Sequence, residues 1–189
     1  GGTAEETVTG SNDGPVAEAQ SIDATEDGGS VTGQLTATDI DGDDLSYALT
    51  EGSTDGTVTV NADGSFSFEP NENFSGETSF TYTVTDPSGA TSTETVTVNV
   101  DGVNDGPIAV DDTASATEDG GAVNINVLGN DTDADGDALS VTSAQLVGGA
   151  EGAVTINDDG TISFDPGEGY QTLAEGETQD VQITYTISD

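Results

Sequence analysis

The sequence predicts an all-β protein that consists of two tandem immunoglobulin-like β-sandwich domains. Short runs such as TVTV, SFSF and FTYTV alternate Thr or Ser with Val, Phe or Tyr. This alternation is the period of a strand with one buried face, and no stretch shows helical periodicity of comparable strength. Several motifs also occur twice in the same order, which indicates two homologous domains.

The repeated motifs cover almost the whole chain. NDGPVA at Asn12 returns as NDGPIA at Asn104, and TYTVTD at Thr81 returns as TYTISD at Thr184. Between them, TDIDGDDLS returns as TDADGDALS and DGSFSF returns as DGTISF. The order is preserved and only the loops lengthen, so we expect both domains to have the same topology.

Seven short strands are expected in the first domain, with turn signals between them. They are expected at residues 16–24, 31–37, 45–49, 57–60, 65–69, 79–85 and 93–100. Asp63-Gly64 is a hairpin signal between two of them. Seven strands in about ninety residues are typical of an immunoglobulin-like sandwich. Six such strands are expected in the second domain, which lacks its final strand within this chain and ends on the strand that holds Tyr185 and Ile187.

The two ends of the sequence suggest where the domains divide. The opening GGTAEETVTGSNDGP resembles the TSTETVTVNVDGVNDGP that follows TYTVTD in the first domain. We therefore expect residues 1–14 to be the last strand and linker of a preceding repeat, or a donated strand. Residues 15–106 form domain 1 and residues 107–189 form domain 2 in this interpretation. Residues equivalent to 1–14 of a next unit would complete domain 2, either covalently or as a strand donated between subunits.

The charge balance restricts the possible functions. The chain of 189 residues has 38 Asp and Glu and no Lys, Arg or His, so its formal net charge is −38. Two carboxylates about 5 Å apart repel by roughly 3 kcal/mol at an effective dielectric near 20. Acidic clusters must therefore stay in water, take up protons or bind cations. The same charge excludes ordinary nucleic-acid binding, which requires basic side chains, and we expect no direct membrane insertion because no long apolar run is present.

The acidic residues gather at predicted loops of one type. In an immunoglobulin-like sandwich, the loop after the second strand and the turn after the sixth lie at the same end. Each domain has three aspartates at alternate positions in that loop and one aspartate at that turn. If the domains stack in tandem, the acidic residues of the linker, such as Asp101 and Asp105, lie opposite the loop of the next domain. The expected metal ligands are Glu26, Asp101, Asn104, Asp105, Asp133, Asp135 and Asp189 at the junction, with Asn12, Asp13, Asp39, Asp41, Asp86 and Glu118 at related positions.

Calcium is the expected ion, because six to eight oxygen ligands in a flexible site suit Ca²⁺. The chain has no Cys or His for softer metals. The alternative is that these acids are ordinary solvated loop residues, which we prefer for isolated pairs such as Asp158-Asp159. An EF-hand does not fit: counting from Asp39 places Asp44 where Gly is required, and counting from Asp131 ends on Thr142 instead of Glu.

These motifs resemble those of a known family. The run YTVTDPSGATSTETVTVNVDGVNDGP is similar to the cadherin signature, TDIDGDD resembles the cadherin D-x-D loop, and Glu26 resembles the glutamate of the first strand. Both domains are more similar still to the bacterial cadherin-like and VCBS repeats of large surface adhesins. The resemblance implies calcium between domains, a role in adhesion or cell-surface architecture, and an extracellular location. The chain departs from cadherins at Asp101, which lies three residues before Asn104 instead of two, and at Gly106, which replaces an Asn.

The expected function is a calcium-stiffened spacer of an extracellular adhesin or surface fibre, with neighbouring copies of the same repeat as partners. One alternative is a filament subunit that donates its N-terminal strand, and another is a calcium-dependent carbohydrate-binding module. Catalysis is not expected, because the chain has no His, Cys or Lys for a nucleophilic mechanism. Surface carbohydrate or protein remains a possible ligand. The sequons at Asn73 and Asn130 are expected by chance in a chain rich in Asn and Thr.

Overall fold

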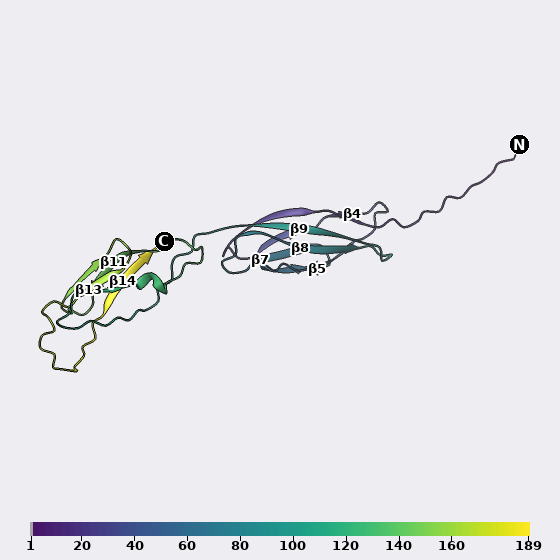
Figure 1. The fold of residues 1–189 in the computed structure, drawn as a ribbon. Coiled ribbons are helices and arrows are strands. Elements are labelled where there is room, and N and C mark those ends of the chain that lie inside the picture. The colour runs from purple at the N-terminus through teal and green to yellow at the C-terminus, as the bar shows by residue number, and fades with distance from the viewer. Residues whose placement is uncertain (1) are drawn as a thin grey trace. The chain divides into compact units, whose positions relative to one another are not determined.

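The regular elements of the computed structural model, which describes residues 2–189, are strands β1–β14 and one 3₁₀ turn, η1 (Val127–Gly129) (Figure 1). The chain divides into two units, the first ending at Val103 and the second running from Asn104 to Asp189. This confirms the predicted all-β class with two tandem sandwich domains.

Unit 1 is a sandwich of two sheets and a short strand pair. The first sheet has the order β2 (Gln20–Thr25), β9 (Thr91–Asp101), β8 (Gly76–Thr85), β5 (Ser46–Glu51). The second has the order β3 (Val31–Gln34), β7 (Ser65–Pro70), β6 (Gly56–Val60), and β1 (Val16–Ala17) pairs with β4 (Ala37–Thr38). β2 runs parallel to β9, whereas the other pairs in this unit are antiparallel.

The core of unit 1 lies between these sheets and follows from the alternation in the sequence. Alternate residues of each strand point to the same face. On β8 these are Phe80, Tyr82 and Val84, each at most 1% exposed. Phe66 of β7 packs on Phe80 with ring centroids 5.4 Å apart, which joins the two sheets. Each fully buried side chain of this kind contributes roughly 1.5–3 kcal/mol of transfer free energy.

Unit 2 repeats this architecture with fewer strands. One sheet has the order β10 (Val123–Ile125), β13 (Ile162–Asp165), β12 (Ala153–Ile156), and β11 (Ser140–Leu146) pairs with β14 (Ile183–Ser188). The single bridge Ile108↔Thr132 corresponds to the pair Val16↔Thr38 of unit 1. Its buried apolar residues are Val127, Ile162, Phe164 and Tyr170.

Three strand predictions were wrong. The strand expected at residues 16–24 is divided into β1 and β2, and the strand expected at residues 31–37 is divided into β3 and β4. Unit 2 has five strands instead of six. Residues 112–117 align with β2 but form no strand. β2 obtains its ladder from β9, and no counterpart of β9 is present in residues 104–189, so the equivalent segment has no strand to pair with.

Residues 2–14 precede the first strand and are exposed. Asn12 and Asp13 nevertheless make the hydrogen bonds to unit 1 that are described below. Val8 is 94% exposed. The assignment of residues 1–14 to a preceding repeat stays a prediction, and Gly1 lies outside the described residues.

Candidate calcium-binding loops

The first acidic group is built by the loop between β4 and β5 in unit 1. Asp39, Asp41 and Asp43 each offer a carboxylate oxygen within 4.8 Å of the others. Asp39 Oδ1 accepts the backbone N–H of Asp41 at 2.9 Å and that of Asp43 at 3.4 Å. Gly42, with φ +78°, supplies the left-handed residue of this turn. The other oxygen of Asp39, Oδ2, is buried and has no hydrogen-bond partner among the described residues.

The segment before β1 is attached to this loop by hydrogen bonds. The backbone N–H of Asp13 donates to Asp41 Oδ2 at 2.7 Å. Asn12 donates from Nδ2 to Asp86 Oδ2 at 2.8 Å, and Asp86 is the first residue after β8. Three separate segments therefore meet at one end of unit 1: the residues before β1, the loop after β4 and the turn after β8.

The local electrostatics of this group differ from residue to residue. The hydrogen bond from Asn12 lowers the pKa of Asp86, assisted by backbone N–H groups of its own turn. Burial raises the pKa of Asp43, and the charges of Asp39 and Asp41 raise it further. Burial and the neighbouring negative charges therefore both oppose the ionisation of Asp43. A bound cation would remove that repulsion.

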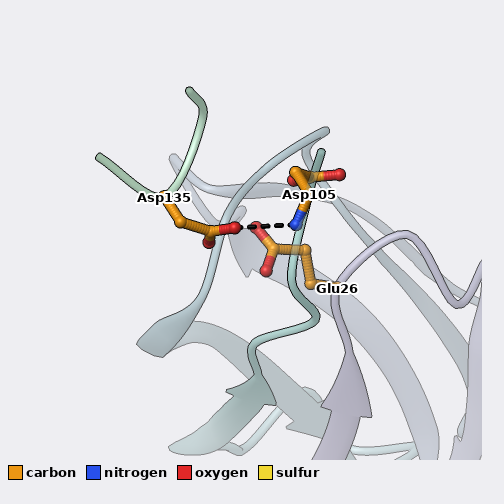
Figure 2. A group of neighbouring side chains, drawn as sticks. All are labelled: Glu26, Asp105 and Asp135. Carbon is orange, nitrogen blue, oxygen red and sulfur yellow. Dashed lines mark hydrogen bonds between the residues drawn. The ribbon is translucent and has the colours of Figure 1, made fainter. Parts of the chain in front are cut away.

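Unit 2 builds the same network from the equivalent residues. Asp133 Oδ1 accepts the backbone N–H of Asp135 at 3.0 Å and that of Asp137 at 3.1 Å, and Asp133 Oδ2 is buried without a hydrogen-bond partner among the described residues. The N–H of Asp105 donates to Asp135 Oδ2 at 2.7 Å (Figure 2). Asn104 Nδ2 donates to Asp189 Oδ2 at 2.7 Å. The four types of hydrogen bond seen in unit 1 are thus all repeated.

Most of the predicted ligands fall into these two groups. Unit 1 brings together Asn12, Asp13, Asp39, Asp41 and Asp86, and unit 2 brings together Asn104, Asp105, Asp133, Asp135 and Asp189. The third loop acids, Asp43 and Asp137, also belong to the groups but were not among the predicted ligands. Their alternate spacing with the other two aspartates of each loop is the signal that could have identified them.

Glu26 is a second kind of acidic position. It follows β2 directly and is only 2% exposed. Its Oε2 accepts the N–H of Val103 at 3.0 Å, and its own N–H donates to the carbonyl of Asp101 at 2.9 Å. A buried carboxylate is costly unless it is paired, and the sequence contains no Lys, Arg or His to pair with it.

Glu118 occupies the position in unit 2 that corresponds to Glu26. Its Oε2 is buried without a hydrogen-bond partner among the described residues, while its backbone carbonyl accepts from Gln171 Nε2 at 3.3 Å. Two points stay predictions. One is that Glu26, Asp101 and Glu118 are metal ligands, and the other is that acidic residues from both domains bind one ion.

The donor chemistry of both groups fits a hard divalent cation. The available ligand atoms are carboxylate and amide oxygens, which are the ligands of Ca²⁺ and Mg²⁺. The buried oxygens of Asp39 and Asp133 that lack a hydrogen-bond partner among residues 2–189 are suited to a metal. Ca²⁺ accepts irregular loops with six to eight oxygens, whereas Mg²⁺ requires near-octahedral geometry and retains its water.

Comparison with known proteins agrees with this architecture. A family model described as bacterial cadherin-like domain matches residues 12–102 and, a second time, residues 104–189. No curated protein matches the sequence significantly.

Among solved structures, PcdhgB3 EC1-4 is similar with a TM-score of 0.57 at 15% identity, covering 96% of this chain and 47% of that one. The human desmocollin-1 ectodomain gives 0.53 at 18% identity, with coverage of 96% and 35%. Protocadherin gamma B7 extracellular cadherin domains 1–4 give 0.53 at 13%, with coverage of 94% and 49%. At these identities the likeness concerns the fold, and the chain spans less than half the length of each structure.

In the part of the chain that the structure describes, no helix is long and apolar enough to cross a membrane. The family match covers both units and agrees with the resemblance seen in the TDIDGDD loop and in the strand and linker that follow Thr81. The chain therefore belongs to the bacterial cadherin-like domain family and carries two copies of the domain in tandem.

Proposed function

We propose that this chain is a calcium-stabilised structural repeat of an extracellular adhesin or surface fibre. The observation that carries the proposal is the repetition of one acidic network in both units, each with a buried carboxylate oxygen that has no hydrogen-bond partner in the described chain. The sequence has no basic side chain that could neutralise either group. In this proposal, cations from the surroundings supply the positive charge.

In each unit the proposed ligands come from three segments. In unit 1 they are Asp39 and Asp41 of the loop, Asp86 of the turn after β8, and Asp13 of the entering segment. Asp133, Asp135, Asp189 and Asp105 take the same roles in unit 2. An ion bound there joins segments that are far apart in sequence, so it stabilises the folded unit by mass action. Extracellular calcium sites have Kd values of about 10⁻⁴–10⁻³ M, which millimolar calcium saturates.

We further propose that the second site restrains the linker between the repeats. Val103 donates its N–H to Glu26 in unit 1, and Asn104 and Asp105, which follow it directly, donate to acids of unit 2. Val103 is thus bonded within unit 1, and Asn104 and Asp105 are bonded within unit 2. Calcium bound by Asp105 and its neighbours, with Glu26 and Asp101 as additional ligands, would stiffen an array of such repeats. Neighbouring copies of the repeat are its partners in this proposal.

The proposal is tested by thermal unfolding in Ca²⁺, in Mg²⁺ and in chelator at fixed ionic strength, together with calorimetric titration of Ca²⁺. Asp39→Asn/Asp41→Asn removes two charges from the unit 1 group, and Asp133→Asn/Asp135→Asn does so in unit 2. Glu72→Gln/Asp158→Asn removes two charges from exposed positions outside both groups and is the matched control.

We expect each loop variant to lose binding stoichiometry and the calcium-dependent stabilisation of its own unit, while the control retains both. Small-angle scattering of the wild type should show a narrower range of dimensions in calcium than in chelator. Equal stabilisation by Ca²⁺ and Mg²⁺, or an unchanged stoichiometry in both loop variants, would refute the proposal.

A further inference from the structure

The strand that ends unit 2 differs from its counterpart in unit 1 in how many neighbours it has. In unit 1, β8 pairs with β5 on one edge and with β9 on the other. β14 has nearly the same sequence as the end of β8, TYTISD compared with TYTVTD. Among residues 2–189, β14 pairs only with β11, so its second edge carries no strand.

The contribution of β9 to unit 1 shows what this edge lacks. β9 supplies Val96, Val98 and Val100 to the core, at 0%, 0% and 5% exposure. On β8, Phe80 and Tyr82 are at most 1% exposed, whereas their counterparts on β14, Ile183 and Tyr185, are only half-buried. β9 also provides the ladder for β2, and the equivalent residues 112–117 of unit 2 form no strand.

A segment of the same chain has the sequence that this edge requires. TAEETVT, residues 3–9, matches TSTETVT, residues 91–97, at the start of β9. In β9 these residues are paired along their length with β8. In residues 3–9 they are exposed and form no strand, although TVT has the alternation of one, and Val8 is 94% exposed where Val96 is fully buried.

We propose that residues 3–8 of one copy of this chain pair antiparallel with β14 of a second copy. In unit 1, Phe80 lies opposite Val96, Tyr82 opposite Glu94, and Thr85 opposite Thr91. Transferred to unit 2, this register places Val8 opposite Ile183, Thr7 opposite Thr184 and Thr3 opposite Ser188. Val8 then covers the half-exposed face of β14. The backbone groups of the open edge obtain partners, which is how a strand added to a sheet edge gains affinity.

Charge decides the conditions under which the pairing is observed. Both copies carry a net charge of −38, so they repel at low ionic strength. This repulsion between exposed charges is screened at separations beyond about 3 Å in 1 M salt. We therefore expect the association to strengthen as salt is raised. The proposed calcium ligand Asp189 directly follows β14, so the measurements are made both with calcium and with chelator.

Cysteine cross-linking tests the register, and the chain offers a clean background because it contains no cysteine. Copies carrying Thr7→Cys are mixed with copies carrying Thr184→Cys and oxidised in 1 M salt. The matched control mixes Thr7→Cys with Thr186→Cys, two residues along the same face of β14. Residues directly opposite have Cβ atoms about 4.5–5.5 Å apart, whereas diagonal neighbours are about 7–8 Å apart and are poorly placed for a disulfide.

We expect a covalent heterodimer from the first mixture at several-fold higher yield than from the control. Sedimentation of the unmodified chain should show association that Val8→Asp abolishes. Thr9→Asp, which adds the same charge at the end of the paired segment and on its other face, should leave the association largely intact. Equal cross-linking in both mixtures would refute the register. A chain that remains monomeric in 1 M salt, with no cross-link in either mixture, would refute the proposal altogether.

Discussion

The backbone N–H of Asp105 donates a 2.7 Å hydrogen bond to the carboxylate of Asp135 (Figure 2). Asp13 makes the same bond to Asp41 in the other unit, also at 2.7 Å. In each case the segment that enters the domain is joined to the acidic loop through its backbone. The side chains of Asp13 and Asp105 therefore need not make this connection, which is compatible with the role of calcium ligands that we propose for them.

Substitution of Asp43 by Asn should have opposite effects with and without calcium. Burial and the nearby charges of Asp39 and Asp41 raise the pKa of Asp43, so its ionisation is less favourable in the folded unit than in an ordinary Asp. We expect Asp43→Asn to raise the Tm in chelator and to reduce the additional stabilisation by Ca²⁺. Differential scanning calorimetry measures both. A lower Tm in chelator would show that repulsion does not control the metal-free unit.

Truncation of equivalent core residues should distinguish the two units. Phe80 is 1% exposed, whereas Ile183 is half-buried. Removal of a buried Phe side chain typically costs about 3–5 kcal/mol because it leaves a cavity. We expect Phe80→Ala to destabilise unit 1 by about that amount. Truncation of a fully buried Ile to Ala usually costs about 2–5 kcal/mol, and we expect Ile183→Ala to destabilise unit 2 by less than this. Urea unfolding followed by residue-resolved NMR reports each unit separately. Equal losses would mean that the face of β14 is already covered.

The close packing around Gly56 predicts that even a small side chain at this position destabilises unit 1. A Cβ at this residue would collide with the ring of Phe68 and would lie 2.7 Å from the carbonyl oxygen of Glu69. Gly56→Ala must displace β6 from β7, and overpacking of this kind costs about 1–3 kcal/mol. Gly52→Ala is the control, because nothing lies within 4 Å of its Cβ position. Chemical denaturation should separate the two variants, and equal midpoints would contradict the collision.

Two equivalent turns should contribute to the loss of stability in acid. The hydroxyl of Ser65 lowers the pKa of Asp63, and the hydroxyl of Thr161 lowers that of Asp159. The folded pKa of each carboxyl therefore lies below the ordinary Asp value of 3.8, which it has in the unfolded chain. Each carboxylate stabilises the fold fully above that ordinary value, and the contribution is lost as pH falls through the folded pKa.

Ser65→Ala should raise the pKa of Asp63 and leave that of Asp159 unchanged. Thr161→Val should raise the pKa of Asp159 and leave that of Asp63 unchanged. NMR titration of the two carboxyl carbons measures both values in one sample. If Ser65→Ala does not shift the pKa of Asp63, then the hydroxyl at 2.6 Å is not the cause of the low pKa.

The sequence predicts the fold well wherever the structure depends on local alternation and turn chemistry. The Thr/Val and Ser/Phe alternation identified β6, β7 and β8, and Asp63-Gly64 identified the hairpin between two of them. The division of the first two expected strands and the missing sixth strand of unit 2 were not predicted, because they depend on pairing between strands. β2 and residues 112–117 occupy equivalent positions in the two units, and β2 has β9 beside it whereas residues 112–117 have no such strand in the described chain.

The acidic groups were predicted in outline for a related reason. The repeated D-x-D spacing and the loop positions of an immunoglobulin-like sandwich were enough to predict that Asp39 and Asp41 lie near Asp86. The use of the Asp13 N–H as a donor could not be read from the sequence, since every residue except proline has the same backbone group. The buried oxygen of Asp39 without a hydrogen-bond partner in the described chain likewise depends on how neighbouring loops pack.

The parallel pairing of β2 with β9 determines how unit 1 would carry a mechanical load. Their ladder runs in register from Gln20↔Val96 to Thr25↔Asp101. Tension along the chain enters unit 1 before β2 and leaves it after β9, so it draws these two parallel strands in opposite directions along their length. The hydrogen bonds of the ladder are then loaded in shear and must break together, instead of opening one after another as at the end of a hairpin.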